Sequence, residues 1–187
     1  LPVLSASFVF GPSSDVSVGG GVGAQLFNTF YILFLSLIVA APVAIGAGIY
    51  LAEYSARGRL ADMIRLSVEC LASVPPIVLG LFGMILFINL MGFGISLGVG
   101  AMTLALMNLP IIVRVTEEAL KTVPREYREA SLALGATKWQ TIARVVLPAA
   151  LPGIVTGVTL TAGRAVGETA ILIFTAGTTA SRMIPDF

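Results

Sequence analysis

Four long apolar stretches alternate with polar segments along the 187-residue chain. A helix that crosses the hydrocarbon core of a bilayer needs roughly 17 to 25 mostly apolar residues. We therefore predict spans at residues 24–52, 66–90, 97–113 and 151–176. The composition supports an all-helical protein embedded in the lipid bilayer. Hydrophobic side chains make up 57% and charged side chains 11%, whereas about a quarter of the residues in soluble domains are charged.

Prolines interrupt two of these spans. Pro42 should kink the first helix, because proline removes a backbone donor and crowds the preceding turn. The adjacent Pro75 and Pro76 cannot both lie inside an unbroken helix, so we predict a break or a strong kink in the second span.

Basic residues indicate the orientation of the spans. Nine of the eleven Lys and Arg residues lie between the first and second spans or between the third and fourth. Cytoplasmic segments carry such an excess. We therefore expect a transmembrane core over residues 24–176 with a cytoplasmic loop at 114–148. Residues 1–23, the turn at 89–96 and the tail at 177–187 are then external.

The sequence lacks the residues of several common chemistries. It has no histidine, the commonest metal ligand and general base near neutral pH, and its one cysteine, Cys70, lies in an apolar stretch. It has no glycine-rich phosphate loop followed by Lys-Ser or Lys-Thr, so we do not expect it to hydrolyse ATP. We predict no catalytic residue, cofactor, metal site or nucleic-acid partner.

The loop before the fourth span predicts a compact elbow of two short helices. The first covers Arg125–Leu134 and stops at Gly135, a residue common after helix ends. The second begins at Thr137, which is spaced from Gln140 as in a capping box, and ends at Pro148. Two interpretations stay open: an anchor with Trp139 at headgroup depth, or a docking site for a cytoplasmic partner.

The same loop resembles a known family. The family pattern is Glu-Ala-Ala, three residues, Gly, nine residues, Ile, one residue and Leu-Pro. Here it reads Glu129-Ala130-Ser131, three residues, Gly135, nine residues and Val145-Val146-Leu147-Pro148. This resembles the EAA loop of bacterial ATP-binding-cassette importer permeases, with serine and valine as conservative departures. The resemblance implies that Glu129, Ala130 and Gly135 contact the ATPase subunit through a coupling helix, with Arg125 and Tyr127 as neighbours.

The resemblance covers nearly the whole chain from Phe27 onward and is closest to the A-type permeases of phosphate transport. It implies a MetI-like, all-α bundle of transmembrane helices with a cytoplasmic coupling-helix elbow, in a bacterial or archaeal cytoplasmic membrane. Such permeases have six helices, so we expect this chain to be the central part of a longer subunit. The supporting segments are residues 47–54, 80–83, 116–120 and 164–170.

The resemblance also implies partners and a solute. The partners are a homologous C-type permease, two ATP-binding subunits and an external phosphate-binding protein. The chain would move phosphate inward by alternating access. Two alternatives remain: a permease for another oxyanion, such as sulfate or molybdate, and a membrane signalling or scaffold subunit that moves no solute.

Charged residues inside the last predicted span are candidates for the solute pathway. Arg164 and Glu168 are four residues apart and should share a helix face near the bilayer centre. Ionisable residues at that depth are costly and usually mark pathways, and a guanidinium can donate two parallel hydrogen bonds to phosphate. The alternative is an ion pair that only fixes packing. Asn108 and Thr169 are weaker polar candidates, and Glu69 is expected to pair with Arg65 or Arg114.

Overall fold

The computed structural model describes residue 9 and residues 21–55, 58–168 and 170–177. Helices account for almost all of this part, as the all-helical prediction expects, and the described residues contain no strand. Most of the expected external segments, 1–23 and 177–187, and also Thr169, lie outside the described residues. The chain divides into two compact units, which are described separately.

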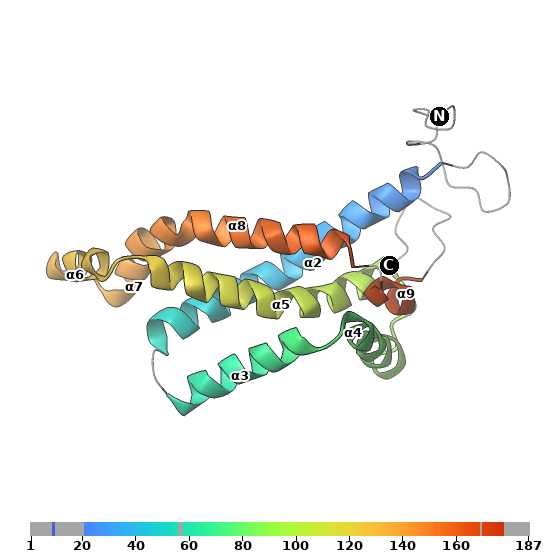
Figure 1. Cartoon of the computed structure of the whole chain (residues 1–187), viewed down its shortest axis with the longest axis horizontal. Coiled ribbons are helices and arrows are strands. Elements are labelled where there is room, and N and C mark those ends of the chain that lie inside the picture. Colours follow the sequence, from blue (N-terminus) through green and yellow to red (C-terminus); the bar gives the residue numbers. More distant parts are fainter. Residues whose placement is uncertain (1–8, 10–20, 56–57, 169, 178–187) are drawn as a thin grey trace. The chain divides into compact units, whose positions relative to one another are not determined.

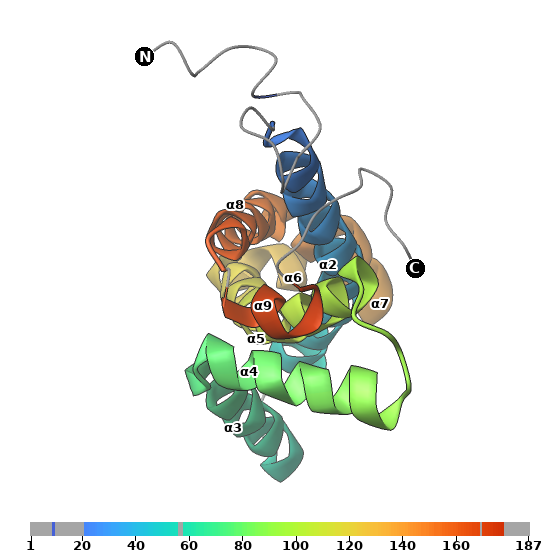
Figure 2. The same cartoon turned by 90° about the vertical axis from the view of Figure 1, so that its right-hand side faces the viewer.

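Unit 1 consists of Leu1–Ile38, Pro75–Leu106 and Arg164–Phe187. Its main contact joins α4 (Pro76–Gly83) to α9 (Ala170–Thr175), which lies against it in Figure 2. Gly80 makes this possible, because a Cβ at that position would lie 3.1 Å from the Ile171 Cα atom. The π-helical η2 (Met84–Leu90) continues α4.

Unit 2 consists of Val39–Val74 and Met107–Gly163. It contains α3 (Arg59–Ser73) and parts of α2 (Gly23–Ile49), α5 (Leu97–Thr122) and α8 (Leu147–Val166). Within the unit, α5 and α8 run side by side (Figure 1), and buried side chains on these helices and directly next to them form one apolar cluster. The buried members of that cluster are Ala119, Leu120, Val123, Val146, Ala150 and Ile154.

Glycines let the helices of unit 2 approach α5 closely. A Cβ on Gly48 of α2 would lie 2.7 Å from the Thr116 Cβ atom, and one on Gly157 of α8 would lie 2.8 Å from the Val115 Cβ atom. These separations are shorter than van der Waals contact, so larger residues would push both helices away from α5.

The first and third predicted spans are continuous apolar helices. The first runs over Gly23–Tyr54, including the π-helical η1 (Tyr50–Tyr54), and passes through Pro42. The third runs over Leu97–Thr122, so the helix extends beyond residue 113, where the predicted span ended. Both are long and apolar enough to cross a membrane.

The second predicted span is broken, as its adjacent prolines suggested. Helix α3 ends at Ser73, Val74 and Pro75 have extended backbone angles, and α4 starts with Pro76 at its first position. Proline is tolerated there because the first helical N–H has no partner within the helix. Residues 66–90 therefore form parts of two helices instead of one.

The fourth span differs more from the sequence prediction. The second helix of the elbow does not end at Pro148, because α7 (Lys138–Thr141), η3 (Ile142–Val146) and α8 form one helix over Lys138–Val166. The π-helical η3 ends two residues before Pro148, and Pro148 lies in the first turn of α8, where its missing N–H is tolerated.

The prediction of one helix over 151–176 is also wrong. Helix α8 ends at Val166, Gly167 follows in a turn, and α9 begins at Ala170. Glycine is a poor helix former, and Gly163 and Gly167 flank the end of α8.

Candidate functional site

The elbow has a well-defined corner. Helix α6 (Arg125–Ala133) begins after Pro124, and Leu134 is its C-cap residue. Beyond it, the Gly135 amide donates to the Leu132 carbonyl at 3.0 Å, and the Ala136 amide donates to the Ser131 carbonyl at 3.3 Å. These two bonds make a Schellman motif, which requires a left-handed residue. Gly135 supplies it with a φ of 81°, so the predicted glycine stop is confirmed.

The capping box at the start of α7 is present as predicted. The Gln140 amide donates to the Thr137 hydroxyl at 3.3 Å, and the Thr137 amide donates to the Gln140 side chain at 2.9 Å. A hydrogen bond of 2.9 Å between the Ser131 and Thr141 hydroxyls joins α6 to α7. The angle of the elbow is thus fixed by local hydrogen bonds.

Replacing Gly135 with alanine should loosen the corner. A non-glycine residue in the left-handed region costs roughly 1–2 kcal/mol, although nothing lies within 4 Å of an added Cβ. We expect a lower melting temperature for the purified permease. The matched control is Gly46→Ala in α2, where the space is also open and alanine favours the helix. Equal melting temperatures for the two variants would contradict this account of the corner.

Helix α6 is exposed on nearly every side. None of its residues is buried, and only Arg128 and Ser131 are half-buried. Large apolar side chains face solvent on this helix and on the adjoining corner and α7. Their exposed fractions are 55% for Tyr127, 50% for Leu132, 90% for Leu134 and 65% for Trp139.

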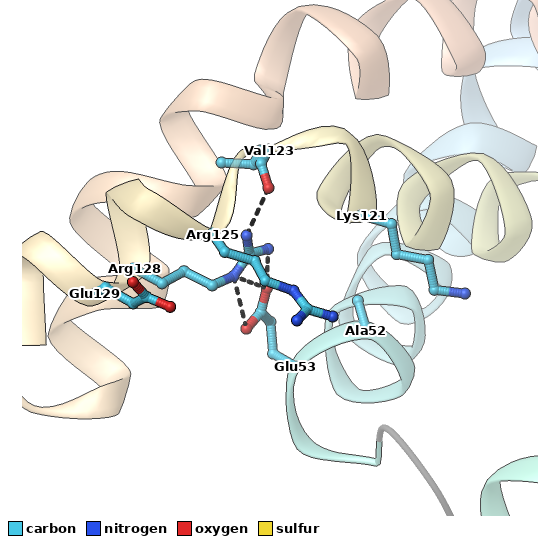
Figure 3. Close-up of a pocket in the computed structure, with 7 residues that line it drawn as sticks. All are labelled: Ala52, Glu53, Lys121, Val123, Arg125, Arg128 and Glu129. Atoms are coloured by element: carbon cyan, nitrogen blue, oxygen red, sulfur yellow. Dashed lines mark hydrogen bonds and ion pairs between the residues drawn. The ribbon is translucent and has the colours of Figure 1, made fainter.

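Arg128 attaches α6 to the rest of unit 2 (Figure 3). Its Nη2 atom lies 2.6 Å from the Glu53 Oε1 atom, and its Nε atom lies 3.1 Å from the same oxygen. The guanidinium also donates to the Val123 carbonyl at 2.7 Å and to the Leu120 carbonyl at 2.8 Å. These are carbonyls at the end of α5, where intrahelical donors run out.

A charged hollow of about 410 Å³ lies beside this ion pair (Figure 3). Two of the predicted coupling residues, Arg125 and Glu129, line it, whereas Tyr127, Ala130 and Gly135 do not. Sequence reasoning missed Arg128 and Glu53. Glu53 follows the first apolar stretch and Arg128 lies in a charged helix, but no pattern in the sequence pairs residues 75 positions apart. The lining residues are Ala52, Glu53, Lys121, Val123, Arg125, Arg128 and Glu129.

Arg164 and Glu168 are close, but they do not share a helix. The Arg164 Nε atom lies 3.6 Å from the Glu168 Oε1 atom, and the two side chains are 54% and 17% exposed. Glu168 lies beyond the end of α8. Arg164 therefore lies in the last turn of a helix, where a cation is favoured by the helix dipole.

Asn108 lies in a fully buried position on α5. Its Oδ1 and Nδ2 atoms have no hydrogen-bond partner within the described part of the chain. Asn108 belongs to unit 2, whereas Arg164 and Glu168 belong to unit 1. Buried amides without partners are rare, so Asn108 stays a candidate for contact with a solute or another subunit.

A second set of ion pairs joins α3 to α5. Glu69 pairs with Arg114 at 3.2 Å, one of the two partners expected for it. Arg65 instead bonds Glu117 at 2.9 Å, and Lys121 bonds the same carboxylate at 2.7 Å. The Arg65 guanidinium also donates to the Leu51 carbonyl of η1 at 3.2 Å.

Comparison with known proteins decides the family. Residues 44–186 match the family described as "Binding-protein-dependent transport system inner membrane component". The chain belongs to this family. The chain is therefore part of an inner-membrane transport component, as the sequence resemblance indicated, and its relatives are named as permeases.

Named relatives refine the comparison. The chain is 46% identical over 96% of its length to the probable ABC transporter permease protein YqgI of Bacillus subtilis, of which it covers 61%. It is 43% identical over 84% of its length to the phosphate transport system permease protein PstA 1 of Mycobacterium tuberculosis, of which it covers 52%. The chain thus spans between about half and three-fifths of these relatives.

A solved structure shares the fold. The chain resembles a chain of the MetNI methionine ABC transporter in an inward facing conformation, with a TM-score of 0.67 and 30% identity. The match covers 80% of this chain and 69% of the other. The MetI-like helical membrane bundle expected from the sequence is therefore confirmed.

Proposed function

We propose that the protein carries inorganic phosphate into the cytoplasm, driven by an ATPase that docks on the elbow formed by α6 and α7. The observation that carries the docking proposal is the exposure of α6, which is held to its own chain mainly through Arg128 and Ser131. A short amphipathic helix is stable when its apolar side chains are covered. A cytoplasmic subunit that binds Leu134 and Trp139 would cover them.

The coupling residues predicted from the family pattern fit this surface. Arg125 and Glu129 present opposite charges at the rim of the charged hollow, and Tyr127 and Ala130 lie on exposed positions of α6. Closure of two ATPase subunits would move α6. The membrane helices attached to α6 would then rock and change the side of the membrane to which the solute pathway is open. The helix breaks at residues 74–75 and 167–168 are places that would absorb this bending.

Topology follows from the charges. Residues 53–65 and 114–148, the latter including the elbow, would be cytoplasmic, because they carry nine of the eleven basic residues. The N-terminal segment would then be external. A homologous C-type permease would complete the pathway, and an external binding protein would deliver the solute.

Phosphate is supported by the PstA relatives and by Arg164. The guanidinium is half-exposed, so it can donate two charge-assisted hydrogen bonds to a tetrahedral oxyanion. Glu168 would keep the arginine oriented and weaken the site enough for release. A single arginine does not distinguish phosphate from sulfate or molybdate by charge.

The test is uptake into liposomes that contain the full-length permease, its companion permease, the ATPase and the binding protein. We expect ATP-dependent uptake of labelled phosphate that arsenate competes and excess sulfate or molybdate does not. Uptake of another oxyanion alone would replace the substrate and keep the architecture. An assembled complex with no ATP-dependent flux would favour a signalling or scaffold role.

A further inference from the structure

Both helices of the elbow hold the same short segment, η1, at the end of the first span. Arg128 of α6 forms the ion pair with Glu53, and the Lys138 Nζ atom of α7 lies 4.6 Å from the centre of the Tyr54 ring. Neighbouring residues of η1 are thus contacted from the two sides of the corner at Gly135. A displacement of the elbow as a unit would act on η1 at two points.

The Glu53 contact is the more protected of the two. The Glu53 side chain is 10% exposed and the Arg128 side chain is 22% exposed, whereas surface ion pairs are screened by water. Charges removed from water need their partner, since either one alone would be left buried without compensation. The pair should therefore persist while the elbow moves.

Arg128 also joins a third element. Its bonds to the Leu120 and Val123 carbonyls hold the end of α5, so one guanidinium contacts α6, η1 and the end of α5 together. A lysine could not reproduce this, because a single ammonium lacks the planar fork that reaches several acceptors.

The segment η1, which Arg128 and Lys138 contact, is a π turn and not a regular α-helix. The Ser55 amide donates to the Tyr50 carbonyl at 3.0 Å, five residues back, which is the π-helical pattern. Such turns often mark functional positions in helices. From α3, Arg65 holds the Leu51 carbonyl of the same turn.

We propose that the Glu53–Arg128 ion pair is a positioning link that passes the displacement of the elbow to the first span. The proposal rests on the proposed function and adds a specific residue pair to it. Arg128 does not contact the ATPase in this account, because it faces its own chain. Glu53 and Arg128 set how much solute is moved per ATP, and the exposed side chains of the elbow set how tightly the ATPase binds.

The test substitutes Glu53→Gln in the full-length permease and measures labelled phosphate uptake and ATP hydrolysis in the same liposomes. We expect uptake per ATP hydrolysed to fall about tenfold, while ATPase copurification and hydrolysis stay within about twofold of the unsubstituted complex. Glu53→Asp keeps the charge and should restore part of the ratio. The matched control is Glu69→Gln, which removes the exposed ion pair with Arg114 in the same unit and should leave the ratio unchanged.

Two outcomes would overturn the link. The first is an unchanged ratio in Glu53→Gln, and the second is an equal fall in Glu69→Gln. If Glu53→Gln fails to assemble, Arg128→Lys is measured instead, and a normal ratio in that variant would also overturn it. Absence of ATP-dependent uptake in the unsubstituted complex would instead refute the proposed function, and the link with it.

Discussion

Replacing Leu134 with aspartate should weaken binding of the ATPase subunit by at least about a hundredfold. Leu134 is 90% exposed at the corner of the elbow, so the substitution removes no contact within the chain. Burying a leucine at an interface contributes about 1.5–3 kcal/mol, and an unpaired carboxylate there adds a desolvation cost. The measurement is the amount of ATPase that copurifies with the tagged full-length permease.

A matched control separates docking from general surface effects. Leu60, on α3, is 62% exposed and lies in the other segment expected to be cytoplasmic. Leu60→Asp should leave copurification unchanged. Normal ATPase binding by Leu134→Asp would show that the elbow corner is not at the interface.

Replacing Arg164 with glutamine should reduce phosphate uptake about tenfold to a hundredfold. Hydrogen bonds to charged groups contribute roughly 1.5–3 kcal/mol, and glutamine keeps a polar side chain without the charge or the paired donors. ATPase binding should be normal, because Arg164 is outside the elbow. The measurement is the initial rate of labelled phosphate uptake by liposomes that contain the assembled complex.

The control for this prediction is Arg114→Gln. Arg114 is 52% exposed and pairs with Glu69 at 3.2 Å, which closely matches the 54% exposure of Arg164 and its pairing with Glu168. We expect uptake by Arg114→Gln to stay within about twofold of the original. Unchanged uptake by Arg164→Gln in an intact complex would mean that its ion pair only fixes packing.

The local structure of the elbow could be predicted because its signals are local. A left-handed backbone at the corner favours glycine, so the role of Gly135 could be predicted from the sequence. A capping box depends on two residues three positions apart, so Thr137 and Gln140 could be predicted as well. The family match covers residues 44–186, which include the loop whose spacing resembles the family pattern. The helix break at Pro75 and Pro76 is decided by the chemistry of proline itself.

The errors arose where hydropathy was used to set helix ends. The apolar run at 151–176 continues through Gly167, so hydropathy alone gave one helix where there are two. A second error came from the proline at 148, which suggested a helix end although α7, η3 and α8 are continuous there. The Glu53–Arg128 pair depends on which helices meet in unit 2, and a single sequence does not contain that information.

The most direct test of the docking claim is photocrosslinking from Trp139, which is 65% exposed. A photoreactive benzoylphenylalanine replaces Trp139 in the full-length permease, and the same residue at Leu60 serves as the control. The account predicts a crosslinked product that contains the ATPase subunit for position 139 and none for position 60. Crosslinks from position 139 to lipid alone would contradict it and would identify the elbow as an anchor at the membrane surface.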